Sequence, residues 1–240
     1  SFKRAVQAYG KSDGKDLEQV QRHLEVAVDE DPSFGKAWFN LAVVQERRGE
    51  TAAARSSYEK ASKVAPGLGA PIVNMGMILV DEGKVDEARS VFETAIQADA
   101  FNPDAHSNMS VYYRRDKDYK NAVRHARLSL AGDSQNLNAY ANLARAYFDM
   151  GAHDVALLVC LNANKIDDKN ADIYNIMGMV WLTKNDVTRA IGQFKKATEL
   201  DPKHVPALMN LGAVILNVRN YAVAIDLFNR VLAEEPKNLE

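Results

Sequence analysis

The feature that most constrains this chain is a repeat with a period of 34 residues. When the sequence is aligned with itself at that shift, small side chains recur at one register and alanine recurs at a second. The first register holds Ala42, Gly76, Ser110, Ala144, Gly178 and Gly212, and the second holds Ala54, Ala88, Ala122, Ala156, Ala190 and Ala224. Because alanine makes up only about one residue in ten of an average protein, this spacing does not arise by chance. It predicts a repeat architecture.

Each unit carries two helical patterns separated by a turn. Apolar residues recur at i, i+3, i+4 and i+7, which is typical of one helix face. Glycines at the turn, Gly49, Gly83 and Gly151, can end the first helix with a positive φ. Because one such hairpin cannot bury its apolar face alone, neighbouring units are expected to stack into an all-α solenoid of antiparallel helix pairs.

The period also predicts the boundaries of the units. Residues 1–34 keep only the second half of the pattern and are expected to form a degenerate N-terminal repeat that caps the stack. Residues 239–240 are interpreted as a remnant of cloning. The six predicted repeats are 35–68, 69–102, 103–136, 137–170, 171–204 and 205–238.

This pattern resembles the tetratricopeptide repeat family. The 34-residue unit of that family carries an aromatic residue, a Leu-Gly pair, a tyrosine, an alanine, a phenylalanine, a second alanine and a terminal proline. The last unit carries it most fully, through Leu208, Leu211, Gly212, Ala224, Phe228 and Pro236. The departures are Ala126 and Cys160 at the aromatic position and Ala100, Ser134 and Asp168 at the proline position. The resemblance implies a right-handed α–α superhelix without enzymatic activity. The pentatricopeptide repeat, with 35 residues and a basic surface, fits less well.

The charge balance and hydropathy bear on the partner. With 30 basic and 32 acidic residues, the chain lacks the positive surface of a general nucleic-acid binder. Its longest apolar run, residues 176–182, is far shorter than the 18 or so residues of a bilayer span. We therefore expect a protein or peptide partner, no nucleic acid and no direct membrane span. The cytoplasm and a bacterial periplasm, with a lipid anchor upstream of Ser1, both remain open.

No constellation of residues indicates catalysis or metal binding. The five histidines are scattered, and Cys160 has no second cysteine to form a metal-binding or redox pair. His106 falls in the aromatic register and Cys160 in a core register, so both are predicted to pack. The prediction is no catalytic residue, no metal and no cofactor.

A row of asparagines marks the candidate binding face. In stacked hairpins the first helices line the concave side, and asparagine is an unfavourable residue inside a helix. Its amide could instead hold the main chain of an extended peptide. The alternative, which is compatible, is that these amides bond to the neighbouring repeat and set the superhelix pitch. The row comprises Asn40, Asn74, Asn108, Asn142 and Asn210, and is interrupted at Ile176, where Asn175 is displaced by one position.

Residues next to this row are expected to give specificity. Met179, Leu182, Met209 and Leu216 form an apolar floor, and Phe39, Val43, Val73 and Met77 form a second apolar strip. Arg114, Arg115 and Arg145 could pair with an acidic side chain. The alternatives are inter-repeat core for the apolar residues and a solvated cluster for the arginines. The basic residues of the family's carboxylate clamp are absent from every window.

The last helix, predicted over 221–234, keeps Ile225, Phe228, Val231 and Leu232 instead of becoming polar. It is expected to continue into further chain, or to dock a partner or a second copy. The predicted function is a protein-interaction scaffold that binds a peptide in its concave groove. The alternatives are the substrate-recognition region of a larger enzyme such as a glycosyltransferase, or a bacterial envelope lipoprotein that assists assembly of pili, secretins or gliding machinery.

Overall fold

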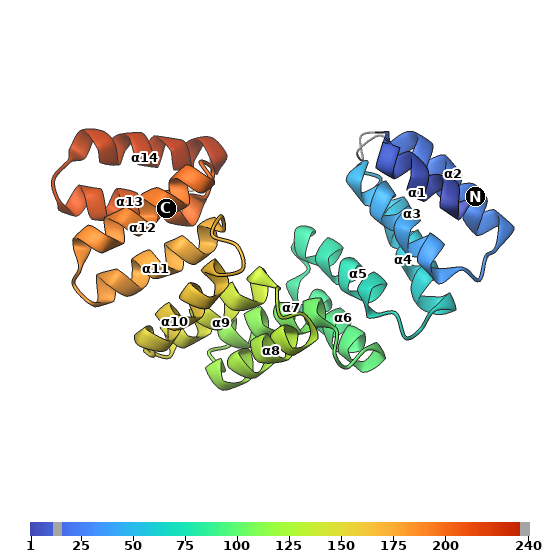
Figure 1. Ribbon diagram of the computed structural model, residues 1–240, viewed down its shortest axis with the longest axis horizontal. Coiled ribbons are helices and arrows are strands. Elements are labelled where there is room, and N and C mark those ends of the chain that lie inside the picture. The colour runs from blue at the N-terminus through green and yellow to red at the C-terminus, as the bar shows by residue number, and fades with distance from the viewer. Residues whose placement is uncertain (12–15, 236–240) are drawn as a thin grey trace. The chain divides into compact units, whose positions relative to one another are not determined.

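The structure is a computed structural model that describes residues 1–11 and 16–235 (Figure 1). In these ranges every regular element is an α-helix, which confirms the predicted all-α class. Pro236 and residues 239–240, on which two of the sequence predictions rest, lie outside the described ranges. The helices are α1 (Phe2–Lys11), α2 (Leu17–Glu30), α3 (Gly35–Arg47), α4 (Thr51–Val64), α5 (Gly69–Asp81), α6 (Val85–Ala98), α7 (Pro103–Arg115), α8 (Tyr119–Gly132), α9 (Leu137–Asp149), α10 (His153–Asn164), α11 (Ala171–Thr183), α12 (Val187–Leu200), α13 (Val205–Asn217) and α14 (Tyr221–Glu234).

The chain divides into two compact units, residues 1–109 and 110–240, with the boundary inside α7. In the N-terminal unit each of the helices α1 to α5 packs on the next one. Its core begins under α1, where Ala5, Leu24 and Leu41 are buried together, and the ring of Phe2 meets that of Phe34 edge to face at 4.8 Å. The first 34 residues therefore contribute a helix pair of their own to this core.

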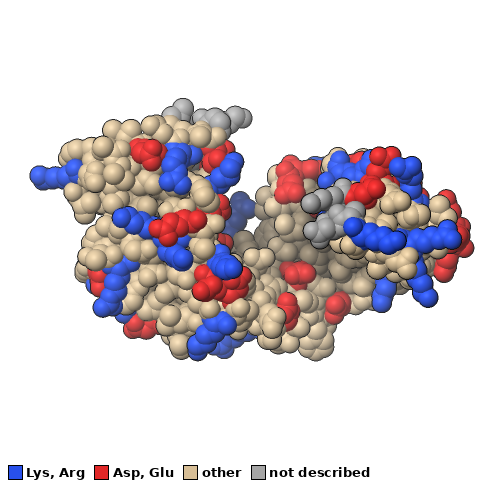
Figure 2. Space-filling view, turned by 45° about the horizontal axis from the view of Figure 1, so that its top comes forward, with Lys and Arg blue, Asp and Glu red and all other residues tan. Residues whose placement is uncertain are grey.

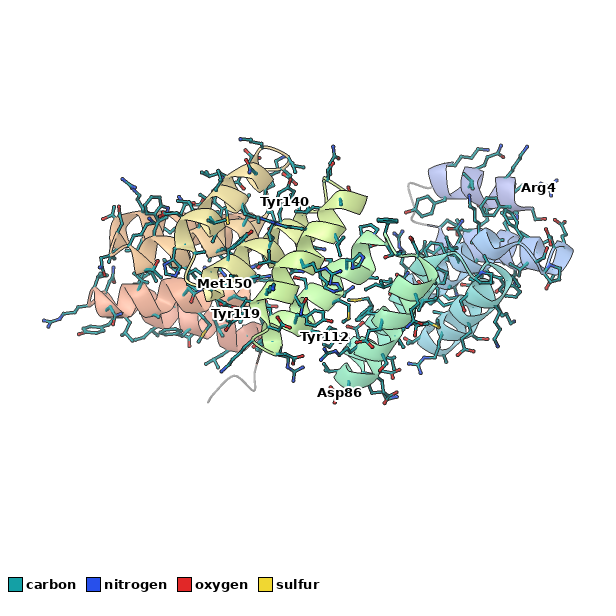
Figure 3. All side chains as sticks on the ribbon, turned by 90° about the horizontal axis from the view of Figure 1, so that it is seen from below. Arg4, Asp86, Tyr112, Tyr119, Tyr140 and Met150 are labelled. Carbon is teal, nitrogen blue, oxygen red and sulfur yellow. The ribbon has the colours of Figure 1, made fainter. Side chains whose placement is uncertain are left out.

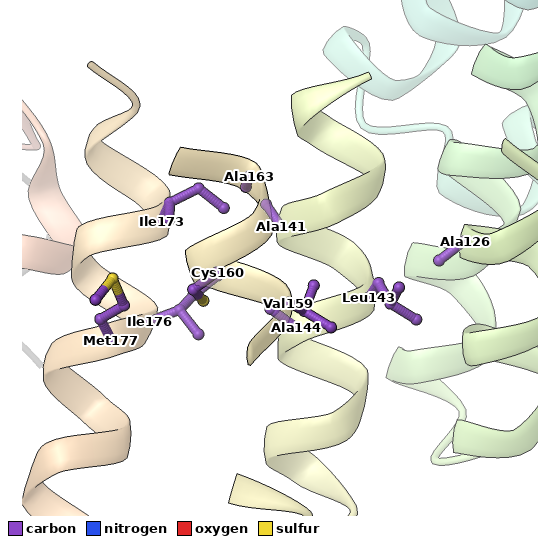
Figure 4. Close-up of a cluster of buried hydrophobic side chains, with 10 residues drawn as sticks. All are labelled: Ala126, Ala141, Leu143, Ala144, Val159, Cys160, Ala163, Ile173, Ile176 and Met177. Carbon is purple, nitrogen blue, oxygen red and sulfur yellow. The ribbon is translucent and has the colours of Figure 1, made fainter. Parts of the chain in front are cut away.

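The C-terminal unit is built in the same way from α8 to α14. Here first helices also contact the next first helix, α9 with α11 and α11 with α13. Figure 4 shows the cluster where α9, α10 and α11 meet, with Cys160 fully buried between Ala144 and Ile176. Burial raises the pKa of the Cys160 thiol to about 12, so the thiol stays protonated at neutral pH. The predicted core role of Cys160 is confirmed.

Glycine occupies the small register where a phenylalanine ring presses on the helix backbone. A Cβ added at Gly76, Gly178 or Gly212 would lie 2.5, 2.4 or 2.7 Å from the ring of Phe92, Phe194 or Phe228. Such distances are too short for any real carbon contact. Among the small-register positions that hold serine or alanine, Ser110 and Ala144 are followed in the second helix by the small residues Ala126 and Cys160, whereas Ala42 is followed by the large Tyr58. The two departures from the family pattern thus place small residues on both helices of a pair.

The turn inside each hairpin requires a left-handed residue at one register. Gly49, Gly83 and Gly151 have φ values of 78°, 75° and 78°, as the sequence predicts. The same register holds Lys117, Asn185 and Arg219 in the other turns, with φ values of 61°, 59° and 63°. The turn geometry is therefore imposed by the repeat even where glycine is missing.

In two repeats, the aromatic register of the first helix bonds to the segment that precedes the repeat. Trp38 Nε1 donates to the carbonyl oxygen of Pro32 at 2.9 Å. Two repeats later His106 Nε2 lies 3.0 Å from the carbonyl oxygen of Ala100, the equivalent pair. His106 is buried rather than half-buried, so its predicted packing role holds and a hydrogen bond is added to it.

Candidate peptide-binding face

A pocket of about 270 Å³ opens between α1, α2 and α3 in the N-terminal unit. Its walls are mostly apolar, and α3 contributes one face of the helix at i, i+3, i+4 and i+7. This face includes Asn40, the first residue of the asparagine row, and Val43 from the predicted apolar strip. The lining residues are Phe2, Ala5, Val6, Tyr9, Val20, Leu24, Asn40, Val43, Val44 and Arg47.

Two polar groups of this pocket, the Asn40 amide and the Arg47 guanidinium, retain capacity to bind a ligand. Arg47 Nη1 donates to Tyr9 Oη at 2.7 Å, and the guanidinium carbon lies 5.8 Å from the Tyr9 ring centroid. Within the described part of the chain Arg47 has no carboxylate partner, and the Asn40 amide makes no hydrogen bond. Because the phenol holds the guanidinium without neutralising it, the pocket presents a positioned positive charge and a free amide beside apolar walls.

The other asparagines of the N-terminal unit already bond to the protein. Asn74 Nδ2 donates to Tyr58 Oη at 2.8 Å, and Tyr58 Oη donates to Glu46 Oε2 at 2.6 Å. Burial and the bond to Glu46 raise the pKa of Tyr58, so the phenol remains a donor. Asn108 Nδ2 donates to the carbonyl oxygen of Asp104, one turn earlier in α7. Each of these amides keeps an acceptor oxygen and a second N–H.

In the C-terminal unit the asparagines of the row have partners within the protein, and two of them are buried. Asn142 is buried and already has a partner. Asn210 Nδ2 donates to Asn175 Oδ1 at 2.8 Å, and Asn175 is only 3% exposed. The displaced Asn175 therefore lies between α11 and α13 and joins two consecutive repeats.

Two of the three predicted arginines form ion pairs within the C-terminal unit. Arg114 Nη1 lies 3.0 Å from Asp149 Oδ2. Arg145 pairs with Asp172, which also accepts from His204 Nε2 at 3.0 Å. Arg115 is exposed and, among the residues that the structure describes, forms no ion pair.

The cluster around Asp172 has a structural role at the start of α13. Burial raises the pKa of Asp172, but the hydrogen bond from His204 and the charge of Arg145 outweigh it and leave the pKa below its usual value. His204 Nδ1 accepts from the Ala207 N–H at 3.1 Å and caps α13. The carboxylate thus holds the capping imidazole in place.

The predicted apolar residues fall into two groups. Met77, Met209 and Leu216 are between 37% and 44% exposed and are accessible to a ligand. Val73 is buried, and the remaining four are half-buried against the cores of their own units: Phe39, Val43, Met179 and Leu182. On α14, Val231 is buried and Phe228 packs on Gly212, whereas Ile225 is 61% exposed.

A set of polar residues that the sequence analysis missed caps the helices. At the register of His204, Asn102, Asn136 and Asn170 accept from the backbone N–H three residues later. In the second helices, Asp16, Asp118, Asp186 and Asn220 do the same. Their 34-residue spacing and their position just before an apolar periodic run are the signals that could have identified them.

Helix length, the placement of metal-binding residue types and surface charge bear on membrane, metal and charged-ligand sites. None of the helices in the described ranges is both long and apolar enough to cross a membrane. The residues that the structure describes include no group of three or more His, Cys, Asp or Glu placed to hold a metal ion. On the face shown in Figure 2, acidic and basic side chains are interspersed.

The stacked helix pairs define an α-helical repeat protein. A sequence model described as tetratricopeptide repeat matches residues 16–67, 73–136 and 177–238, well over half of the chain. The chain belongs to the tetratricopeptide repeat family. Proteins of this family generally act as scaffolds for protein–protein interaction.

Several known proteins are similar to this chain. The anaphase-promoting complex subunit CDC16 of Saccharomyces cerevisiae is 24% identical over 210 residues, which are 84% of this chain and 25% of the relative. The type IV pilus assembly protein PilF of Pseudomonas aeruginosa is 21% identical over 161 residues, 65% of this chain and 64% of the relative. The chain thus spans a quarter of the first and just under two thirds of the second.

A solved structure of a tetratricopeptide repeat protein from Parabacteroides merdae superimposes with a TM-score of 0.72 at 15% identity. The match covers 99% of this chain and 94% of that one. At this identity the likeness supports the fold alone.

Proposed function

We propose that the chain is a non-enzymatic scaffold that binds a peptide segment of a partner protein along its first helices. The observation that carries the proposal is the pocket between α1, α2 and α3. In the described part of the chain its Asn40 amide makes no hydrogen bond and its Arg47 guanidinium has no carboxylate partner. Its apolar walls suit a bulky aliphatic or aromatic side chain, Asn40 suits the adjoining peptide bond, and Arg47 suits a neighbouring carboxylate.

The remaining asparagines have a mixed role in this proposal. Asn74, Asn108 and Asn210 hold the repeats or their own helix through one N–H each. Their remaining amide groups are half-buried, so those of Asn74 and Asn108 extend the peptide-binding face of the N-terminal unit beyond the pocket. The six predicted repeats and the N-terminal pair at 1–34 are, in this proposal, the units that supply these residues.

The proposal is tested with an array of short peptides in which one bulky apolar residue does or does not adjoin an aspartate or glutamate. The full chain is expected to retain the apolar–acidic peptides. Replacing Asn40→Ala together with Arg47→Gln should weaken that binding about tenfold or more, since two hydrogen bonds are lost, one of them to a charged group.

The matched control is Arg48→Gln, which alters the adjacent arginine that is ion-paired with Glu50 at 2.9 Å. It should leave peptide binding unchanged. The proposal would be wrong if the chain retained peptides equally well with and without the acidic residue. It would also be wrong if the Asn40→Ala/Arg47→Gln variant bound with unchanged affinity.

A second candidate function is assistance in assembling a bacterial envelope machine. The similarity to PilF, a type IV pilus assembly protein, is the observation that favours it. Loss of pili on deletion of the gene from a piliated bacterial host would support this candidate, and normal piliation would exclude it.

A further inference from the structure

One second helix of the C-terminal unit is apolar on its outer side as well as toward the core. On α10 the inward residues Ala156, Cys160 and Ala163 are fully buried. On the outside, Leu158 is 57%, Leu161 45% and Val155 41% exposed. We call these three residues the α10 ridge. They are contiguous, because residues three apart are neighbours on a helix surface.

The α10 ridge departs from the pattern that the chain itself uses at these positions. In the six other second helices the two leucine registers are small, polar or charged. The register of Leu158 holds Arg22, Ser56, Ser90, Arg124, Gly192 and Asp226, and that of Leu161 holds Glu25, Glu59, Glu93, Arg127, Lys195 and Asn229. Since the fold is the same in every repeat, it does not require leucine at either register.

The second helices before and after α10 in the sequence expose basic side chains. The preceding second helix, α8, carries Lys120, Arg124 and Arg127 on its exposed side and contains no acidic residue. The following one, α12, exposes Lys195 and Lys196, together with Glu199 one turn after Lys195. In the described part of the chain Arg124, Lys195 and Lys196 form no ion pair. The sole acidic residue within α10, Asp154, forms an exposed ion pair with Lys184.

The second helices before and after α10 in the sequence also have open surface. A shallow depression of about 410 Å³ on α8 is lined by Lys120, Val123, Arg124, Arg127 and Leu128. On α12, Gly192 occupies the register of Leu158, and no atom lies within 4 Å of the point where its Cβ would be. In the turn before α10, Met150 is 50% exposed (Figure 3).

We infer that the α10 ridge is a docking surface for a partner protein, and that the docked element is an amphipathic helix whose apolar stripe is bordered by Asp and Glu. The exposed leucines supply the apolar contact, and the cations on α8 and α12 pair with carboxylates on the two borders of the incoming helix. Three apolar side chains on one helix favour a single helix over a lipid surface, which requires a broader apolar face. This surface is separate from the pocket at Asn40 and does not depend on the function proposed for it.

The test uses the full chain and three synthetic helical peptides of equal length. One has leucines at i, i+3, i+4 and i+7 with glutamate borders, one has the same leucines with lysine borders, and one is a scramble of the first. Fluorescence anisotropy should show binding of the glutamate-bordered peptide, weakened by added salt.

The decisive variant is Leu158→Ser/Leu161→Glu, the pair of residues that α4 and α6 already carry at these registers. It should keep the wild-type unfolding midpoint and bind the glutamate-bordered peptide about tenfold more weakly or worse. The charge variant Arg124→Ser/Lys195→Glu should also weaken binding and flatten its salt dependence. One control should bind normally: Val26→Lys, at an exposed apolar site on α2.

Four results would overturn the inference. They are equal binding of the scrambled or lysine-bordered peptide, undiminished binding by Leu158→Ser/Leu161→Glu, ridge-dependent binding to phosphatidylserine vesicles in place of the peptide, and ridge-dependent self-association in sedimentation velocity.

Discussion

At the scale of single residues, the volume of one side chain in a first helix is matched by that of another in the second helix. Gly178 lies under the ring of Phe194, which is fully buried, whereas Ala144 and Cys160 share the equivalent space one repeat earlier. Because interiors are close-packed, a methyl group added at Gly178 has to be offset by a smaller side chain at Phe194 or by a shift of the two helices, since Ala42 is accommodated beside the fully buried Tyr58. The pair, and not either residue alone, is the unit of packing.

Gly178→Ala should therefore destabilise the C-terminal unit by about 1 to 3 kcal/mol, since the new Cβ would lie 2.4 Å from Phe194 Cε1. The measurement is the urea midpoint by circular dichroism. The combined variant Gly178→Ala/Phe194→Cys copies the Ala144 and Cys160 pair and should cost less than the sum of its two single substitutions.

Gly192→Ala is the matched control for this prediction. Gly192 is exposed in the interior of α12 and has open space around it, so alanine should stabilise the unit by about 0.5 to 1 kcal/mol. A stabilising Gly178→Ala, or strictly additive energies in the double variant, would show that the glycine does not serve close packing.

At the scale of elements, helix ends are fixed by side chains that recur with the same 34-residue spacing. Asp118 and Asp186 cap α8 and α12 by accepting from the backbone N–H three residues later. The equivalent residue of α10 is Ala152, which offers no such acceptor. Its backbone angles, φ −83° and ψ 57°, are close to those of Asp118, φ −85° and ψ 70°. The α10 N-terminus is thus shaped for a cap that it lacks.

Ala152→Asp should stabilise the chain by about 0.5 to 2 kcal/mol, because the new carboxylate can accept from the N–H of Val155 and interact favourably with the helix dipole. The readout is again the urea midpoint. Asp186→Ala, the reverse change at the same register, should lower stability by a similar amount. A neutral or destabilising Ala152→Asp would mean that the cap geometry is not reproduced at this turn.

At the scale of the whole molecule, stability is expected to be shared mainly between neighbouring helices, since each repeat contacts only those next to it. The two tryptophans report on different units: Trp38 lies in residues 1–109 and Trp181 in residues 110–240. A local change can therefore be followed separately in each unit.

In a Trp38→Phe background, Gly178→Ala should lower the urea midpoint of tryptophan fluorescence clearly, because Trp181 is in the same helix. In a Trp181→Phe background, the same substitution should shift the signal of Trp38 less, since local unfolding in a repeat array does not have to be global. Equal shifts at both tryptophans would mean that the two units unfold as one cooperative body.

Much of the fold could be predicted because the 34-residue period repeats one local solution. The all-α class, the turns at Gly49 and Gly83, and the buried position of Cys160 all follow from registers in the sequence. Lys117, Asn185 and Arg219 adopt the same left-handed turn without glycine, which only the context of the repeat explains.

The candidate site was less predictable, because the use of a polar side chain depends on what lies across from it. Asparagine at one register is free at Asn40, bonds to a neighbouring tyrosine at Asn74, and returns to its own helix at Asn108. The arginines behave likewise, since the acidic partners of Arg114 and Arg145 come from other helices.

The sequence by itself determined the family and the helical hairpin, because these depend on periodicity and on local backbone preferences. Only the tertiary structure decided which amide and guanidinium groups lack a partner within the protein. It also decided that α1 forms a wall of the pocket at Asn40, and that Leu158 and Leu161 of α10 are exposed to solvent. The physical reason is that hydrogen bonds and burial are settled between helices far apart in the chain, where a repeat period carries no information about the individual partner.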